Sequence, residues 1–272
     1  MISVVILTFN EEANLVRCLA SVGWCDDVLV VDSGSTDGTL EVARAGGARV
    51  ITRAFDSFAQ QRNHAMVHGQ VRHPWTLHLD ADEAVPDALR DEMKDIARSR
   101  APRFEVYRVP SRLILDGHWL RHAGMYPSYQ VRFGRTEHLR FVDHGHGQRE
   151  VQPASAVGTL RQPLDHYNFS KGANDWFARH LRYARQEARQ AIATSGRDAS
   201  LAGLLDPDAT VRRRAAKQFA NHMPARPLLR FLHAYVLRRG FLDGTAGFRY
   251  AVMLAIYQYF IDLNREELEA GP

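Results

Sequence analysis

The stretch "ISVVILTFNEEANLVRCLASV" (residues 2–22) decides the fold class of this chain. Its first eight residues form a continuous run rich in β-branched side chains, which predicts a strand buried on both faces. Asn10 can then cap a helix, and apolar residues at positions 15, 18, 19 and 22 repeat at helical spacing. A buried strand that leads directly into an amphipathic helix is the repeating unit of a parallel sheet with helices on both faces.

The same alternation continues through the first hundred residues. Further strands are predicted at 26–35, 48–53 and 75–82, and further helices at 36–47, 58–69 and 86–100. The later stretch "RFEVYRVPSRLIL" (103–115) alternates as an antiparallel strand does, and residues 174–193 have helical spacing. The sequence therefore predicts an α/β fold with a mostly parallel sheet, followed by a helical C-terminal extension.

Length and composition are typical of a soluble globular protein, because 45% of the 272 residues are hydrophobic and 24% are charged. The two cysteines, Cys18 and Cys25, cannot form a disulfide framework and fit a reducing compartment. Met1 runs straight into the first predicted strand, so we expect no signal peptide. These features predict a cytoplasmic protein.

Positive charge gathers towards the C-terminus. Residues 171–272 carry 16 Lys and Arg against 10 Asp and Glu. This excess indicates an anionic partner, either a membrane or a nucleic acid, but a coding bias towards arginine explains it equally well, since only three residues of the chain are lysines. The arginines alternate with large aliphatic residues at helical spacing, which disfavours nucleic acid.

The stretch "WTLHLDADEAV" (75–85) crowds acids at the end of a predicted buried strand. Asp80 and Asp82 are one residue apart and Glu83 follows, and each carboxylate raises the pKa of its neighbours unless a positive group lies between them. A divalent cation, an arginine or plain solvent can relieve this repulsion. Hard cations such as Mg²⁺ bind one or two carboxylates and fill the rest of their shell with phosphate oxygens and water.

Asn10, Asp32 and Asp80 all lie at predicted strand ends. Since ligands bind where the carboxyl ends of parallel strands meet, we expect these residues to converge on one crevice; the alternative is that each caps the following helix. Asp32 opens the loop "VVDSGSTDGT" (30–39), whose small residues allow a ligand to approach the backbone. Its carboxylate can accept hydrogen bonds from a nucleobase or ribose. No G-x-G-x-x-G follows the first strand, which disfavours a dinucleotide site.

Four stretches in this order, "VVILTFNEEANLVRCLASV", "VLVVDSGSTDGTLEVA", "FAQQRNHAM" and "WTLHLDADE", resemble consecutive motifs of family 2 glycosyltransferases of the GT-A fold. The stretches "YQVRF", "QRE…GTL" and "LDHYNFSKG" are similar to the WaaE/KdtX-like branch, which builds lipopolysaccharide core and exopolysaccharide. The resemblance implies a catalytic domain over residues 1–170, with a nucleotide-sugar half (1–102) and an acceptor half (103–170). Residues 171–272 would form the helical extension.

The resemblance also implies a role for individual residues. Thr8, Asn10, Glu11 and Asp32 would hold the uridine of the donor, and Arg62 and Asn63 would lie near the nucleotide sugar. Asp80 and Ala81 would belong to the nucleotide-sugar site, with Asp80 also touching the metal. Asp82 would bind Mg²⁺ or Mn²⁺ through the diphosphate.

An inverting transfer needs a base that takes the proton of the acceptor hydroxyl. In the resembling branch this base is a glutamate in a His-Glu pair before a G-x-L stretch, which implies Glu150 here, although Arg149 stands where the branch has His. Asp143 is the second candidate. The alternative for Glu150 is a surface acid paired with a neighbouring arginine. His166 and Tyr167 either line the same cleft or fill a small core.

Residues 228–263 combine aromatic residues and arginines, the composition of a peripheral anchor on an anionic membrane. Their longest uncharged stretch, 250–261, is too short to span a bilayer. The alternative is that these residues cover a core or form a contact in a homo-oligomer. The expected acceptor is a glycan or a lipid-linked sugar.

Three other functions are disfavoured. A sugar nucleotidyltransferase on a related fold needs a Gly-rich basic loop after the first strand, where this chain has the acidic stretch "TFNEEAN". A phosphoacceptor receiver domain with Asp32 as acceptor is much shorter than this chain. A non-catalytic module that binds membrane or nucleic acid leaves the acids at the strand ends unexplained.

Overall fold

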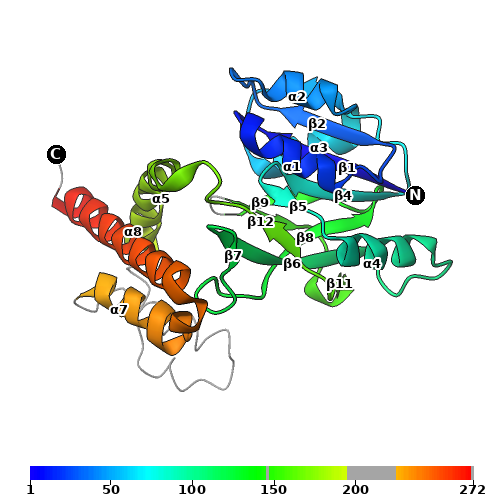
Figure 1. Cartoon of the computed structure of the whole chain (residues 1–272). Coiled ribbons are helices and arrows are strands. Elements are labelled where there is room, and N and C mark those ends of the chain that lie inside the picture. The colour runs from blue at the N-terminus through cyan, green and yellow to red at the C-terminus, as the bar shows by residue number, and fades with distance from the viewer. Residues whose placement is uncertain (145–146, 195–224, 271–272) are drawn as a thin grey trace. The chain divides into compact units, whose positions relative to one another are not determined.

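The computed structural model describes residues 1–144, 147–194 and 225–270, and the chain divides into two compact units (Figure 1). The first unit contains Met1–Trp119 and Tyr126–Lys171, and the second contains Leu120–Met125 and the chain from Gly172 onwards. The part of the predicted helical extension that covers 195–224 lies outside the described residues.

The first half of the first unit alternates strands and helices, as predicted. Its elements are β1 (Ile2–Thr8), α1 (Glu12–Ser21), β2 (Val28–Asp32), α2 (Thr39–Ala45), β3 (Arg49–Thr52), α3 (Phe58–His68) and β4 (Trp75–Asp80). The four strands are parallel in the order β3-β2-β1-β4, so the strands that end in Thr8, Asp32 and Asp80 are neighbours. The predicted fold class, a mostly parallel sheet with helices on both faces, is confirmed.

Both faces of this sheet are covered because β1 is apolar on both sides. On one face, Val4 and Ile6 pack in a core with Leu15 of α1 and with residues of α4 (Asp87–Arg98). On the other face, Val5 packs with Ala65 of α3. Successive side chains of a strand point to opposite faces, so the β-branched run supplies apolar contacts to both layers.

The second half of the first unit extends the sheet with mixed strands. These are β5 (Glu83–Ala84), β6 (Val106–Leu115), β7 (His118–Trp119), β8 (Ser128–Arg135), β11 (Val157–Thr159) and β12 (Leu164–His166). The order continues β4-β8-β6-β12-β5, with β8 antiparallel to both of its neighbours. Because β12 pairs with β5, His166 lies opposite Glu83. A separate two-stranded sheet consists of β9 (Phe141–His144) and β10 (Gly147–Glu150).

The second unit is helical, which confirms the predicted class of the C-terminal extension. Its described helices are α5 (Gly172–Thr194), α7 (Arg226–Leu232) and α8 (Gly244–Ala270), with a π-helical turn at His233–Leu237 and a 3-10 turn at Gly240–Asp243. Gly247 lets α8 pass close to this last turn, since a Cβ there would lie 2.0 Å from the carbonyl oxygen of Gly240. Asp243 accepts the backbone N–H groups of His122 and Ala123, which explains why residues 120–125 belong to this unit.

Candidate active site

The carboxyl ends of β1, β2 and β4 form the edge at which the predicted site residues meet. In the sheet register Thr8 lies opposite Asp32, and Leu7 lies opposite Asp80. The Thr8 hydroxyl donates a hydrogen bond of 3.0 Å to Asp32 Oδ1. The sheet therefore brings together three segments that are far apart in the sequence.

Asp32 is fully buried and organises the loop that follows β2. Its Oδ2 accepts the backbone N–H groups of Gly34 and Ser35 at 2.9 and 2.8 Å, and its Oδ1 accepts the Ser35 hydroxyl. Gly34 has a φ of +92°, a backbone conformation that residues with a Cβ rarely adopt. The carboxylate thus fixes a tight loop beside the end of β1, and any ligand at this edge would lie against that loop.

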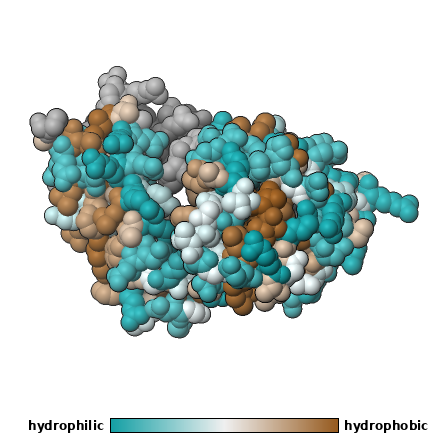
Figure 2. All heavy atoms as spheres, turned by 90° about the horizontal axis from the view of Figure 1, so that it is seen from above, coloured by the Kyte–Doolittle hydropathy of each residue, from teal (hydrophilic) through white to brown (hydrophobic). Residues whose placement is uncertain are grey.

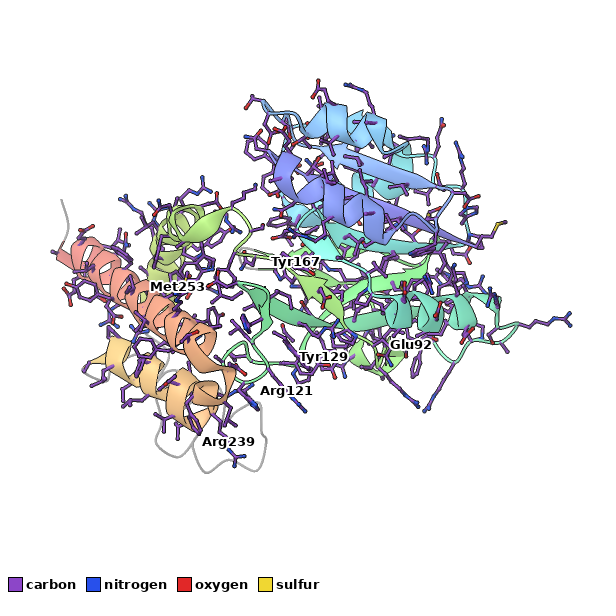
Figure 3. All side chains as sticks on the ribbon, in the orientation of Figure 1. Glu92, Arg121, Tyr129, Tyr167, Arg239 and Met253 are labelled. Atoms are coloured by element: carbon purple, nitrogen blue, oxygen red, sulfur yellow. The ribbon has the colours of Figure 1, made fainter. Side chains whose placement is uncertain are left out.

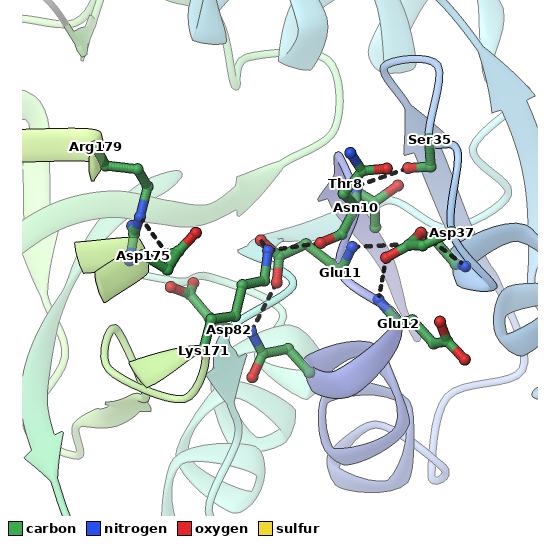
Figure 4. A network of polar contacts seen from close by, with 12 residues as sticks. Thr8, Asn10, Glu11, Glu12, Ser35, Asp37, Asp82, Lys171, Asp175 and Arg179 are labelled. Atoms are coloured by element: carbon green, nitrogen blue, oxygen red, sulfur yellow. Dashed lines mark hydrogen bonds and ion pairs between the residues drawn. The ribbon is translucent and has the colours of Figure 1, made fainter. Parts of the chain in front are cut away.

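Asn10 joins the two loops and does not cap α1. It has a φ of 55°, which asparagine tolerates better than most residues. Its backbone N–H donates to the Ser35 hydroxyl at 2.8 Å, and its side-chain oxygen accepts the backbone N–H of Thr36 at 2.8 Å (Figure 4). Residue 11, not Asn10, precedes the first turn of α1, so the capping alternative is wrong for Asn10.

Two acids, Asp37 and Glu12, also form hydrogen bonds between these two segments. Asp37 accepts the backbone N–H of Glu12, and the Glu12 carboxylate accepts the backbone N–H of Gly38 (Figure 4). Each acid therefore binds a free N–H group at the start of the other segment's helix, where negative charge is favourable. These bonds hold the two loops as one rigid edge.

Glu11 and Asn10 are also bound by Lys171, which sequence reasoning did not single out. The Lys171 ammonium group lies 2.5 Å from Glu11 Oε1 and donates to the Asn10 carbonyl at 2.6 Å (Figure 4). Burial raises the pKa of Glu11, and the hydrogen bonds from Asn14 and Lys171 oppose this shift. The carboxylate that was predicted to hold uridine is thus engaged by a lysine and an amide in this structure.

Asp80 is held by two buried arginines, which is how the crowding of acids at this strand end is relieved. Arg62 Nη2 lies 2.6 Å from Asp80 Oδ1, and Arg132 Nη2 lies 2.6 Å from Oδ2. Arg132 also binds Glu83 at 2.9 Å, and Glu83 accepts the Asp80 backbone N–H. Both arginines are at most 2% exposed, whereas the Asp80 side chain is 31% exposed, so water reaches the Asp80 ion pairs from the acid side only.

Asp82 points to a different partner. Its Oδ2 lies 3.2 Å from His166 Nε2, which the pairing of β12 with β5 brings to this edge. Burial alone would lower the pKa of His166. The charge of Asp82 and the hydrogen bond to it outweigh this effect and raise the pKa to about 9. His166 therefore lies against the acids that follow β4. Tyr167, the next residue and labelled in Figure 3, lies instead under the Arg17 guanidinium, whose carbon is 4.0 Å from the centre of the tyrosine ring.

The residues at this edge fit a divalent cation that is completed by its ligand. Among the described residues, no group of three or more His, Cys, Asp and Glu side chains is arranged to hold a metal by itself. The Asp82 carboxylate nevertheless offers oxygen donors, whereas both Asp80 oxygens are bound by arginines, and His166, whose raised pKa keeps it protonated, offers a donor only after it loses that proton. Mg²⁺ and Mn²⁺ accept such a partial set when phosphate oxygens and water supply the rest.

Asn63 and Ala81 lie where direct contact with a ligand is limited. The Asn63 amide donates to the carbonyl of Phe141 at 2.8 Å and accepts the N–H of the same residue at 3.0 Å. The Ala81 side chain is buried in the main core, so only its backbone is left to face the edge.

The two base candidates lie on the β9–β10 hairpin. Glu150 is opposite Phe141, and Asp143 is opposite Gln148. Directly opposed residues of antiparallel strands share a face, and residues two apart on one strand do too, so both acids lie on the face that carries the Phe141 ring. Glu150 is half-buried and Asp143 is exposed.

Comparison with known proteins agrees with this arrangement. A model of the family "Glycosyl transferase family 2" matches residues 3–147, more than half of the chain. The chain is 24% identical over 283 residues to an uncharacterised glycosyltransferase of Rickettsia bellii, a match that covers 100% of this chain and 88% of that protein.

Two further relatives match in part. The chain is 31% identical over 173 residues to the lipopolysaccharide core biosynthesis glycosyltransferase LpsC of Rhizobium meliloti, covering 59% of this chain and 60% of LpsC. It is 35% identical over 118 residues to an uncharacterised glycosyltransferase of Rickettsia typhi, covering 43% of this chain and 40% of that protein. The chain thus spans less than two thirds of the length of these two relatives. It belongs to glycosyl transferase family 2.

Proposed function

We propose that this enzyme transfers a sugar, with inversion, from a nucleotide-sugar donor to a glycan or lipid-linked acceptor, and that it needs Mg²⁺ or Mn²⁺. The observation that carries the proposal is the set of acids that follows β4, at the same edge of the sheet as the rigid loops of Asn10 and Asp32. A nucleoside at these loops would direct its diphosphate towards Asp82. We propose UDP as the nucleotide, following the family resemblance.

In this proposal the protein's own groups divide the work. Asp82, with Asp80 near it in the sequence, would hold the cation, which would neutralise the charge that develops on the departing diphosphate. Glu150 would take the proton of the acceptor hydroxyl while that oxygen bonds to the anomeric carbon of the sugar. The bond from this carbon to the diphosphate oxygen breaks at the same time, and the nucleoside diphosphate leaves with the bonding electrons.

The class of acceptor follows from the relatives. The Rhizobium meliloti protein is named for lipopolysaccharide core biosynthesis. We therefore propose an acceptor of lipopolysaccharide core, lipid-linked or exopolysaccharide type. Incubating the protein with UDP-, GDP- and dTDP-sugars in Mn²⁺, and measuring slow hydrolysis of each donor, tests the donor class without the acceptor. We expect one UDP-sugar to be hydrolysed, while hydrolysis of GDP- or dTDP-sugars alone would contradict the choice of UDP.

We further propose that the second unit docks on the inner face of the cytoplasmic membrane. Large apolar side chains between residues 228 and 242 are 37–75% exposed: Leu228, Leu229, Leu232, Val236, Leu237, Phe241 and Leu242. Figure 2 shows hydrophobic residues at the surface of this unit among hydrophilic ones. Arg239 is exposed beside them, whereas Met253 of α8 is buried (Figure 3). Within the described parts of the chain, no helix is apolar over a stretch long enough to cross a bilayer.

Flotation with liposomes tests this docking. We expect the protein to float with anionic vesicles at low salt and to dissociate as salt rises. Changing Arg238 and Arg239 to Gln should weaken binding by about thirtyfold, because each arginine near an anionic surface contributes about 1 kcal/mol. Changing Arg98 and Arg100 to Gln removes the same charge from the first unit and should have little effect. If the folded protein does not float with the vesicles, docking is contradicted. If it then sediments as a dimer, the apolar surface is a contact with a second copy of the chain.

A further inference from the structure

The β9–β10 hairpin, which carries both base candidates, is held to the rest of the first unit by one residue in particular. The hairpin forms its own two-stranded sheet and does not join the hydrogen-bond ladder of the main sheet. A two-stranded sheet is marginally stable on its own, so its position depends on what it packs against. That support comes from α3.

Asn63 on α3 binds the hairpin as a neighbouring strand would. Its amide nitrogen donates to the Phe141 carbonyl at 2.8 Å, and its amide oxygen accepts the Phe141 N–H at 3.0 Å. One side chain thereby satisfies both backbone groups of one residue, which fixes the distance and the orientation of β9 relative to α3. The Phe141 ring is buried in a core cluster with Ala59 of the same helix.

Phe141 also links the hairpin to the candidate donor site. The Phe141 ring lies edge-on to His78, with ring centres 5.3 Å apart, and the Arg62 guanidinium lies 5.9 Å from the ring centre. Arg62 in turn binds Asp80 at 2.6 Å. Glu150 is the residue opposite Phe141, on the same face of the hairpin. A short chain of contacts therefore runs from the candidate base to the acids at the end of β4.

We infer that Asn63 is a positioning residue, which sets the place of Glu150 by clamping Phe141, and that it does not act by touching the donor. The inference rests on the proposed function for its kinetic consequence. The nitrogen and the oxygen of the Asn63 amide each make a hydrogen bond to Phe141, which fixes the plane of the amide against β9. Since displacement of a reacting group by about 1 Å can cost about a hundredfold in rate, loosening this clamp is expected to slow the chemical step.

A double-mutant cycle tests the inference. We expect Asn63→Ala to reduce kcat by about ten- to a hundredfold while the Kd for UDP in Mn²⁺ stays within about twofold. In a Glu150→Gln background the same change should lower kcat by less than about threefold. The glutamine no longer accepts a proton, so displacing it has little further effect on the rate. Gln60→Ala removes an exposed amide from the same helix and serves as the matched control. If Asp143 is the base, the coupling appears with Asp143→Asn instead.

A second readout does not depend on activity. Backbone amide hydrogen exchange in β9 and β10 should become at least about tenfold faster in Asn63→Ala and stay unchanged in Gln60→Ala. Asn63→Asp keeps an oxygen that accepts the Phe141 N–H but loses the group that donates to the Phe141 carbonyl. We expect an intermediate exchange rate for this variant, which replaces Asn63→Ala in the experiment if the alanine variant does not fold.

Unchanged exchange in the hairpin would overturn the inference. So would a loss of UDP affinity with kcat preserved, or costs that multiply independently in the double mutant. A wild-type protein that neither binds UDP nor hydrolyses UDP-sugars would instead contradict the proposed function, and the exchange experiment would still decide whether Asn63 clamps the hairpin.

Discussion

Replacing Asp82 with Asn should abolish sugar transfer and remove the effect of Mn²⁺ on UDP binding, while the protein stays folded. The change removes the negative charge of the carboxylate that follows β4, and with it the charge that would hold a cation against the diphosphate. The protein should still fold because asparagine has the same shape as aspartate, and because the Asp82 side chain is partly exposed, at 17%. Calorimetric titration with UDP, with and without Mn²⁺, measures the effect.

Asp95→Asn is the matched control for this substitution. Asp95 lies on α4, is 78% exposed and pairs only loosely with Arg98, at 3.6 Å. Its replacement makes the same chemical change away from the site and should leave both transfer and UDP binding as they are. An Asp82→Asn protein that still binds UDP more tightly in Mn²⁺ than in its absence would show that the cation is held elsewhere.

Glu150→Gln should separate chemistry from donor binding. We expect turnover to fall by about two to four powers of ten, the usual contribution of general-base catalysis, with UDP affinity near normal. The amide keeps the size of the side chain but no longer accepts the proton of the acceptor hydroxyl. Single-turnover measurements with the donor found in the panel, together with UDP titrations, give both quantities.

Two further variants are compared with Glu150→Gln: a control, and the other candidate base. Glu137→Gln changes an exposed acid outside the hairpin and should be silent. Asp143→Asn changes the other acid on the same face of the hairpin. If Asp143→Asn is inactive and Glu150→Gln retains activity, the base is Asp143, and the assignment of Glu150 is wrong.

The sequence predicted the first half of the sheet well because local signals agree there. The β-branched run of β1 and the helical spacing in α1 each specify their own element, and strand ends in a parallel sheet meet by topology. The convergence of Asn10, Asp32 and Asp80 was therefore predicted from their positions at strand ends, and the observed strand order brings those ends together.

The partners of these acids could not be predicted in the same way. Arg132 is 52 residues from Asp80, and Lys171 is 160 residues from Glu11. Neither contact has a signature in sequence spacing, since each depends on which strands of the mixed half become neighbours. An arginine in a stretch that otherwise reads as a buried strand, as in "YQVRF", was the available signal for Arg132, because a buried arginine needs an acidic partner.

Asn10 and Asn63 show a second limit. Both are short amides at the ends or on the faces of helices, where capping or ligand contact is the usual interpretation. In the structure each amide binds the backbone of another segment, Thr36 for Asn10 and Phe141 for Asn63. Side chains that bind distant backbone are invisible to local propensity, because the backbone groups that they satisfy are specified by tertiary packing.

We expect the edge formed by β1, β2 and β4 to bind a nucleoside diphosphate through a cation. Calorimetric titration of the unmutated protein with UDP, once in Mn²⁺ and once in EDTA, tests it most directly. We expect binding in Mn²⁺ and at least about tenfold weaker binding in EDTA, since the cation offsets the repulsion between the diphosphate and the acids at this edge. Equal affinity in the two buffers, or no binding of UDP in either, would contradict the account.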